Sequence, residues 1–152
     1  METIKFEIKI NADAKKVYRT MLGLDSRDTY NEWTAEFSPS STVEGDWQKG
    51  SKMLFVAYDS TGKRGGMVSV IEENIPDVYV SIKHIGVLDG DNEINEGEAV
   101  DKWAGSLENY FFEEDGGVTT VRVECDTVDE YKDFFDTAWP KALNKLKEIC
   151  EK

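Results

Sequence analysis

The sequence is poor in the residues that hold metals and disulfides. It contains two cysteines, Cys125 and Cys150, and one histidine, His84. The two cysteines lie far apart and form no CxxC pair, so neither a disulfide framework nor a cysteine-ligated zinc site is expected. We therefore predict reduced, packed thiols in a cytoplasmic protein, with no metal and no cofactor.

Long apolar runs and positive charge are also scarce. No stretch approaches the roughly 18 residues of a membrane span, and the N-terminal METIKFEIKI alternates charged with apolar residues, unlike a signal peptide. Eighteen basic residues against 31 acidic ones give a net charge of −13. Binding to nucleic acid or to an anionic membrane is therefore disfavoured, and we interpret the acidity as a source of solubility.

The rest of the composition indicates one folded domain. The chain has 152 residues, and its 39% of hydrophobic residues are enough to bury a core. Only three prolines are present, and there is no internal repeat or linker-like tract. We expect residues 1–152 to form a single domain and the protein to be a monomer.

The first part of the chain predicts a strand followed by helices. Apolar and charged residues alternate in KFEIKI, which is typical of a half-buried strand. Asn11 is a suitable N-cap for a helix that Gly23 would end. Asp25 or Ser26 would cap a second, shorter helix.

Six strand-like segments follow, separated by turn residues. They are TVEGDW, SKMLFVAY, GGMVSVIEE, DVYVSIKHIGVL, WAGSLENYFFEE and GVTTVRVECD. Because the connections between most of them are short and rich in glycine, asparagine and aspartate, we predict an antiparallel meander and not alternating strands and helices.

A long amphipathic helix is expected at the end of the chain. Its apolar residues recur at steps of three and four and are Tyr131, Phe135, Ala138, Ala142, Leu146 and Ile149. Thr127 and Glu130 have the spacing of a capping box. Pro140 predicts a kink or a break near Trp139.

These elements predict an α+β fold. A sheet of about six to seven strands must twist and curl, and the C-terminal helix is the only long element that can cover its apolar face. We expect a curved antiparallel sheet wrapped around this helix, with one or two short helices after the first strand. A hollow is expected between the sheet and the helix.

Several stretches carry a resemblance to a known family. They are NADAKKVYRTML, the segment around Trp33, WQKGSKMLF, GGMVSVIEENIPDVYVSIKHIG, YFFEEDGGVTTVRVECD and DFFDTAWPKALNKLKEICEK. Together they resemble the START-like, or SRPBCC, superfamily with its helix-grip fold. The chain is most similar to the branch named for the Aha-type activator of the heat shock protein 90 ATPase.

The resemblance implies a cavity for a lipid, a polyketide or another apolar molecule. In some branches it implies a cyclase, a hydrolase or a chaperone-partner role. The acidic segment 88–101 is longer than a meander needs, and we expect it to form a loop at the rim of the cavity.

Strand alternation predicts which side chains face the hollow. In DVYVSIKHIG the more apolar set is Val78, Val80, Ile82 and His84. In VTTVRVECD the valines from residue 121 onward and the cysteine form the inward set. In the strand between residues 107 and 112 alternation alone does not decide, and the resemblance favours the even-numbered set that includes Tyr110.

We expect the ligand to contact ten residues. They are Trp33, Phe37, Phe55, Met67, Ile82, His84, Glu108, Tyr110, Phe135 and Trp139. Within this set, His84 and Glu108 would orient a polar group of the ligand. His84 beside a carboxylate is also a weak candidate for a general base, although a hydrogen-bonded structural histidine is the simpler interpretation.

No motif indicates an enzyme. The sequence has no GxSxG segment, DSTGKRGG lacks the first glycine and the serine or threonine of a P-loop, and the acidic segment lacks the glycine and final glutamate of an EF-hand. We therefore predict the binding of a small, mostly apolar molecule. The alternatives are an interaction with a chaperone ATPase, such as heat shock protein 90, and a cyclase- or hydrolase-type enzyme that uses His84 as base.

Overall fold

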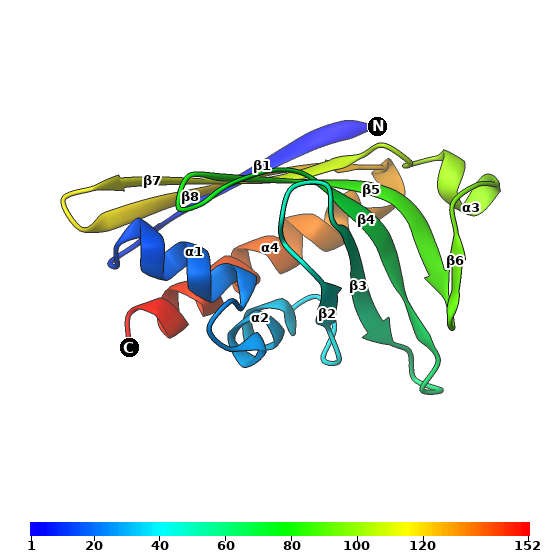
Figure 1. Cartoon of the computed structure of the whole chain (residues 1–152), viewed down its shortest axis with the longest axis horizontal. Helices are drawn as coiled ribbons and strands as arrows, with labels where there is room; N and C mark the ends of the chain where they lie inside the picture. Colours follow the sequence, from blue (N-terminus) through cyan, green and yellow to red (C-terminus); the bar gives the residue numbers. More distant parts are fainter.

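The computed structural model describes residues 1–152 and contains an antiparallel sheet curved around one long helix (Figure 1). The elements in chain order are β1 (Glu2–Ile10), α1 (Ala14–Leu22), α2 (Arg27–Thr34), β2 (Thr42–Gly45), β3 (Lys52–Tyr58), β4 (Arg64–Ile75), β5 (Tyr79–Asp89), β6 (Asn92–Ile94), α3 (Glu98–Asp101), β7 (Leu107–Asp115), β8 (Val118–Thr127) and α4 (Asp129–Cys150). The fold is α+β, as expected, with eight strands instead of six or seven.

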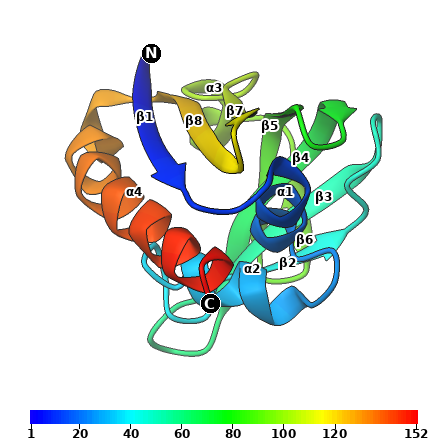
Figure 2. The same cartoon turned by 90° about the vertical axis from the view of Figure 1, so that its left-hand side faces the viewer.

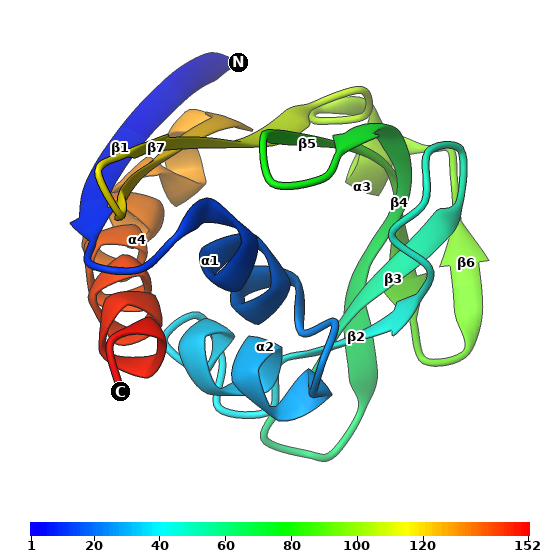
Figure 3. The same cartoon turned by 60° about the vertical axis from the view of Figure 1, so that its left-hand side comes forward.

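All strands belong to one sheet. They pair in the order β1-β8-β7-β5-β4-β3-β2, β6 pairs with β5, and every pair is antiparallel. The β4–β5 ladder shifts register between Val68 and Ser69 and between Ile71 and Glu73. Such bulges bend a strand and increase its twist. The sheet accordingly curls from β1, beside α4, to β2 and β3 on the opposite side (Figure 3).

The helices α1, α2 and α4 lie on the concave side of the sheet. Figure 3 shows α1 inside the curve, with α4 along one side and α2 below it. The C-terminal end of α4 lies close to the end of β1 (Figure 2). There the Asn11 N–H donates to Glu151 Oε2 at 2.8 Å, and Lys147 Nζ donates to the Lys9 carbonyl at 3.0 Å. These bonds join the end of β1 to the last turn of α4.

Local signals define the ends of the two short helices. Asp13 caps α1, because its carboxylate accepts a hydrogen bond from the Lys16 N–H at 2.8 Å. The prediction of Asn11 as the cap is therefore wrong by two residues. Gly23 ends α1 in the left-handed conformation (φ 68°), as predicted. Ser26, one of the two predicted alternatives, caps α2.

The helix α4 runs without interruption through Pro140, so of the predicted kink or break the break is wrong. The proline ring leaves the Asp136 carbonyl without its helical donor, and the burial of the apolar face of α4 keeps the segment helical. The predicted capping box is also wrong. The N-cap is Val128, and the Thr127 hydroxyl donates to the Val128 carbonyl at 3.1 Å. No helix of the protein is both long enough and apolar enough to cross a membrane.

The acidic segment 88–101 is more regular than the expected loop. It contains β6, which adds a short strand to β5, and the single turn of α3. A side chain at Gly86 would approach the Ile94 carbonyl oxygen to 2.6 Å, so glycine permits this close packing. Residues 103–106, which we expected to begin a strand, form turns before Leu107.

Two apolar clusters stabilise the sheet. The larger one contains 24 buried residues from the concave face and from α1, α2 and α4. The smaller one consists of Val56, Val68 and Leu88. By strand alternation, Val56 points away from the concave face, on the same side as Lys52, which forms an ion pair with Glu93 at 2.8 Å.

Replacing Pro140 with alanine is expected to stabilise the protein. The change restores the hydrogen bond to the Asp136 carbonyl in an exposed part of α4, and we expect the free energy of unfolding to rise by about 1–2 kcal/mol. Urea denaturation measures this, with the exposed neighbour Lys141→Ala as the control. A loss of stability in Pro140→Ala would show that α4 needs the proline to fit the sheet.

Candidate functional site

The inner face of the sheet carries the side chains that alternation predicted. Val80, Ile82 and His84 of β5 are buried, and so are the three predicted residues of β8. On β7 the even-numbered set faces inward, with Tyr110 only 2% exposed. Val78 is the exception, because it precedes β5 in a turn and is 51% exposed.

Trp139 of α4 is the centre of an aromatic cluster on this face. Its ring centroid lies 4.8 Å from that of Phe37, 5.9 Å from that of Trp33, and 6.1 Å from those of Tyr110 and Phe6. These rings come from α2, β1, β7 and the α2–β2 connection. Where we expected a hollow, the side chains of the protein itself occupy this part of the space between α4 and the sheet.

The other predicted residues lie around this cluster. Phe135, on the preceding turn of α4, is half-buried against the core, and Ile82 is fully buried within it. The ring of Phe55 lies 6.1 Å from that of His84. Met67 pairs with Phe55 in the β3–β4 ladder but is not part of the core cluster. Nine of the ten residues therefore belong to one neighbourhood, and Met67 lies at its edge.

Four polar side chains are linked inside this aromatic region. Ser69 Oγ lies 2.7 Å from His84 Nδ1, and His84 Nε2 lies 3.3 Å from Glu108 Oε1. The Tyr110 hydroxyl donates to Glu108 Oε2. No lysine or arginine pairs with Glu108, and His84 is the one basic side chain within hydrogen-bond distance of it. A carboxylate in such surroundings is costly to bury unless neighbouring groups bond to it, and two neighbours do so here.

The titratable groups near Glu108 favour hydrogen bonding over nucleophilic chemistry. Burial raises the pKa of Tyr110, and the Glu108 carboxylate raises it further. The same two causes raise the pKa of Tyr30 and of the Cys125 thiol. Burial also raises the pKa of Cys150 to about 11. The two phenols therefore remain donors at neutral pH, and neither cysteine is ionised to act as a nucleophile.

Both cysteines are free and buried, as predicted. Nowhere in the chain are three histidine, cysteine or acidic side chains grouped so that they could hold a metal ion.

The indole N–H of Trp139 is a buried donor without an oxygen or nitrogen acceptor. It faces the thiol of Cys125, a weak acceptor whose pKa is raised by burial and lowered in part by this contact. The other tryptophans nearby differ, since the Trp33 N–H donates to the Met21 carbonyl and the Trp103 N–H to the Ala99 carbonyl, both at 2.9 Å. Leaving a buried N–H unpaired costs about 1–3 kcal/mol. The Trp139 N–H is therefore a position in the cluster where an acceptor from a bound molecule would add a hydrogen bond.

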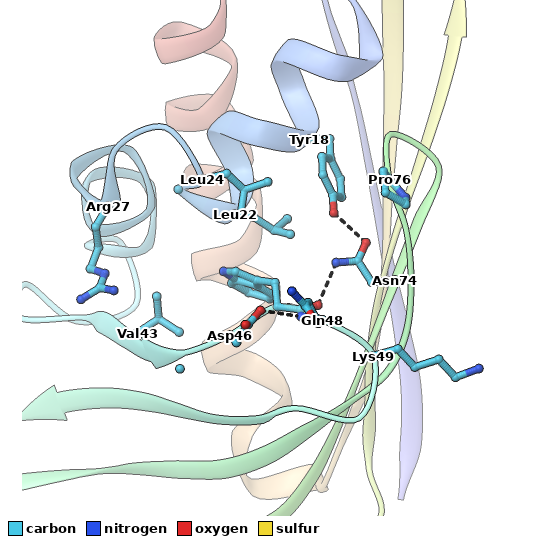
Figure 4. Close-up of a pocket in the computed structure, with 13 residues that line it drawn as sticks. Tyr18, Leu22, Leu24, Arg27, Val43, Asp46, Gln48, Lys49, Asn74 and Pro76 are labelled. Atoms are coloured by element: carbon cyan, nitrogen blue, oxygen red, sulfur yellow. Dashed lines mark hydrogen bonds between the residues drawn. The ribbon is translucent and has the colours of Figure 1, made fainter.

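Two cavities lie outside the aromatic cluster. One, of about 590 Å³, lies between the end of α1, the start of α2, the β2–β3 connection and the β4–β5 turn (Figure 4). The other, of about 460 Å³, lies beside the β3–β4 turn. None of the ten predicted residues lines either cavity. Sequence reasoning missed the first cavity because its walls come from separate segments that share no motif.

No family model matches the sequence, and a comparison with curated proteins gives no match either. Solved structures do match. The chain is similar to the Aha1 dimer from Colwellia psychrerythraea, with 23% identity, a TM-score of 0.68, and 99% of this chain and 97% of that chain covered.

Two further matches have the same architecture. CalU16 from Micromonospora echinospora is 15% identical with a TM-score of 0.64, covering 97% of this chain and 75% of the other. Protein NE0264 from Nitrosomonas europaea is 11% identical with a TM-score of 0.70, covering 97% and 92%. The fold is therefore the helix grip, as the sequence predicted.

Replacing Tyr110 with phenylalanine tests the hydrogen bond between Tyr110 and Glu108. The change removes the donor to Glu108 and leaves the aromatic ring in place, so we expect the free energy of unfolding to fall by about 1–3 kcal/mol. Tyr79→Phe on β5 is the matched control, because Tyr79 is only half-buried and packs against Phe111. Equal stability of the two variants in urea denaturation would mean that the Tyr110–Glu108 bond contributes nothing.

Proposed function

We propose that the protein binds a small, mostly apolar molecule that carries a hydrogen-bond acceptor, on the concave face of the sheet beside α4. The observation that supports this most directly is the N–H of Trp139, which has no oxygen or nitrogen acceptor inside an aromatic cluster. A lipid- or polyketide-like molecule with a carbonyl group matches this chemistry, because its body replaces apolar contacts while its oxygen accepts from the indole.

The Glu108 carboxylate would hold a second polar atom of the ligand. Its side chain retains 19% exposure although it belongs to the inward set of β7. The carboxylate already accepts from Tyr110, and it has further lone pairs for a ligand hydroxyl. Tyr30, whose pKa the same carboxylate raises, supplies another hydroxyl nearby.

Entry of such a ligand requires side chains to move. Trp33, Tyr110 and Trp139 are at most 2% exposed, so they form the fixed part of the site. Phe37 and Phe135 are only half-buried and lie on the α2–β2 connection and on α4, respectively. We expect these two rings to swing outward when the ligand enters.

The matched pair acetophenone and ethylbenzene tests the role of the indole. Both have a similar apolar body, and only acetophenone has an acceptor. We expect acetophenone to bind about five- to tenfold more tightly, since one hydrogen bond to a buried donor contributes about 1 kcal/mol or more. NMR titration that follows the Trp139 indole signal measures the difference.

The variant Trp139→Phe should remove this preference, whereas the control Trp103→Phe should keep it. Native mass spectrometry of the protein purified from its source cells should show a retained molecule in the unmodified protein and less of it in Trp139→Phe. Equal affinities of acetophenone and ethylbenzene for the unmodified protein would contradict the proposal.

A second candidate is a surface interaction with a chaperone ATPase. Tyr131 and Phe134, on the N-terminal half of α4, are 53% and 47% exposed, and exposed aromatic side chains are common in protein interfaces. A solved structure with the same fold is described as an Aha1 dimer.

This second candidate predicts that the protein stimulates the ATPase of heat shock protein 90 and that Tyr131→Ser with Phe134→Ser removes the effect. The control Trp139→Phe should retain it, because Trp139 is buried. An ATPase rate that is unchanged by the unmodified protein would eliminate this candidate.

A further inference from the structure

We propose that the cavity of about 590 Å³ between α1, α2 and the β2–β3 connection is a second binding site, which takes a small amphipathic carboxylate. Its size falls within the range of small-molecule sites. It is distinct from the site beside Trp139, because none of the ten ligand-contacting residues predicted from the sequence lines this cavity.

The floor of the cavity is apolar. Leu22, Val43 and Trp47 are buried side chains that also line the cavity, so each presents part of its surface to it. Figure 4 shows Leu22 and Val43 on opposite sides of the space, with Leu24 at its edge. An aromatic or branched apolar group is the type of molecule that such a floor accommodates.

One wall is held in place by a chain of hydrogen bonds. The Tyr18 hydroxyl donates to Asn74 Oδ1 at 2.6 Å, and Asn74 Nδ2 donates to the Trp47 carbonyl at 2.8 Å (Figure 4). Burial raises the pKa of Tyr18, which keeps this hydroxyl protonated as a donor. Bonds between α1, β4 and the β2–β3 connection therefore preserve the shape of the cavity before any ligand binds.

Arg27 supplies the charge that a carboxylate needs. Each of the other three arginines has an acidic partner: Arg19 with Asp25, Arg64 with Glu44 and Arg122 with Glu113. Arg27 forms no ion pair, although the chain contains 31 acidic residues. It extends from the first position of α2 beside the cavity (Figure 4).

The other charged side chains that line the cavity are Lys49 and Asp46. Lys49 pairs with Glu73 at 3.2 Å, and Asp46 accepts the Gln48 N–H at 3.0 Å. Lys49 is therefore neutralised by its partner, Asp46 keeps its negative charge, and Arg27 is the one cation of the lining without an acidic partner. A single guanidinium matches one carboxylate in a two-point contact, whereas a phosphate-rich ligand would meet too few cations in a protein of net charge −13.

The probes 4-phenylbutyrate and 4-phenylbutan-1-ol test this site, because they share an apolar body and differ in the charged group. We expect 4-phenylbutyrate to produce saturable shifts of the amide signals of residues 45–49 with a Kd of about 1 mM or lower, and the alcohol to bind at least about tenfold more weakly. NMR titration of the full chain measures both.

Arg27→Gln should weaken the binding of 4-phenylbutyrate by about tenfold and leave that of the alcohol unchanged. Arg122→Gln removes the same charge from β8, far along the sheet, and should have no effect. Trp139→Phe should also have no effect, which separates this site from the one proposed above. No saturable shift with 4-phenylbutyrate, equal binding of acid and alcohol, or equal losses in the two arginine variants would each overturn the proposal.

Discussion

The packing of α4 against the concave face of the sheet is the contact on which the rest of the structure depends. Trp139 contacts rings from β1, α2, β7 and the α2–β2 connection, so one side chain joins elements from both halves of the chain. Large aromatic groups bury much apolar area in such a position. The same packing encloses the indole N–H without an oxygen or nitrogen acceptor. The requirement to close the sheet around the helix therefore takes precedence over hydrogen bonding at this atom.

Glu108 shows the same conflict between burial and polarity. A leucine or phenylalanine at this position would pack in the aromatic surroundings without the cost of burying a carboxylate. The chain instead places Tyr110 and His84 within bonding distance of Glu108, and Ser69 orients the far nitrogen of the histidine. Polar groups that are buried in an apolar core and held there by hydrogen bonds from their neighbours are typical of functional sites.

Much of the fold follows from short-range patterns, whereas the continuity of α4 and the cavity beside Arg27 depend on long-range contacts. Alternation predicted the inward side of β5 and β8 because one face of each strand is buried. Gly23 ends α1 because the turn there needs a positive φ. By contrast, Pro140 lies inside a continuous helix, since the packing of α4 outweighs one lost hydrogen bond. The cavity beside Arg27 depends on side chains from four segments, and no pattern within any one of them indicates that they meet.

Trp47 connects the two proposed sites physically. Trp47 lines the cavity beside Arg27. The centroid of its ring lies 6.2 Å from that of Tyr30 and 5.9 Å from that of Phe55. Burial and the Glu108 carboxylate raise the pKa of Tyr30, so its hydroxyl stays protonated. A molecule that moved Trp47 from either side would therefore alter the walls of the other site. Thermodynamic linkage requires any such coupling to be equal in both directions.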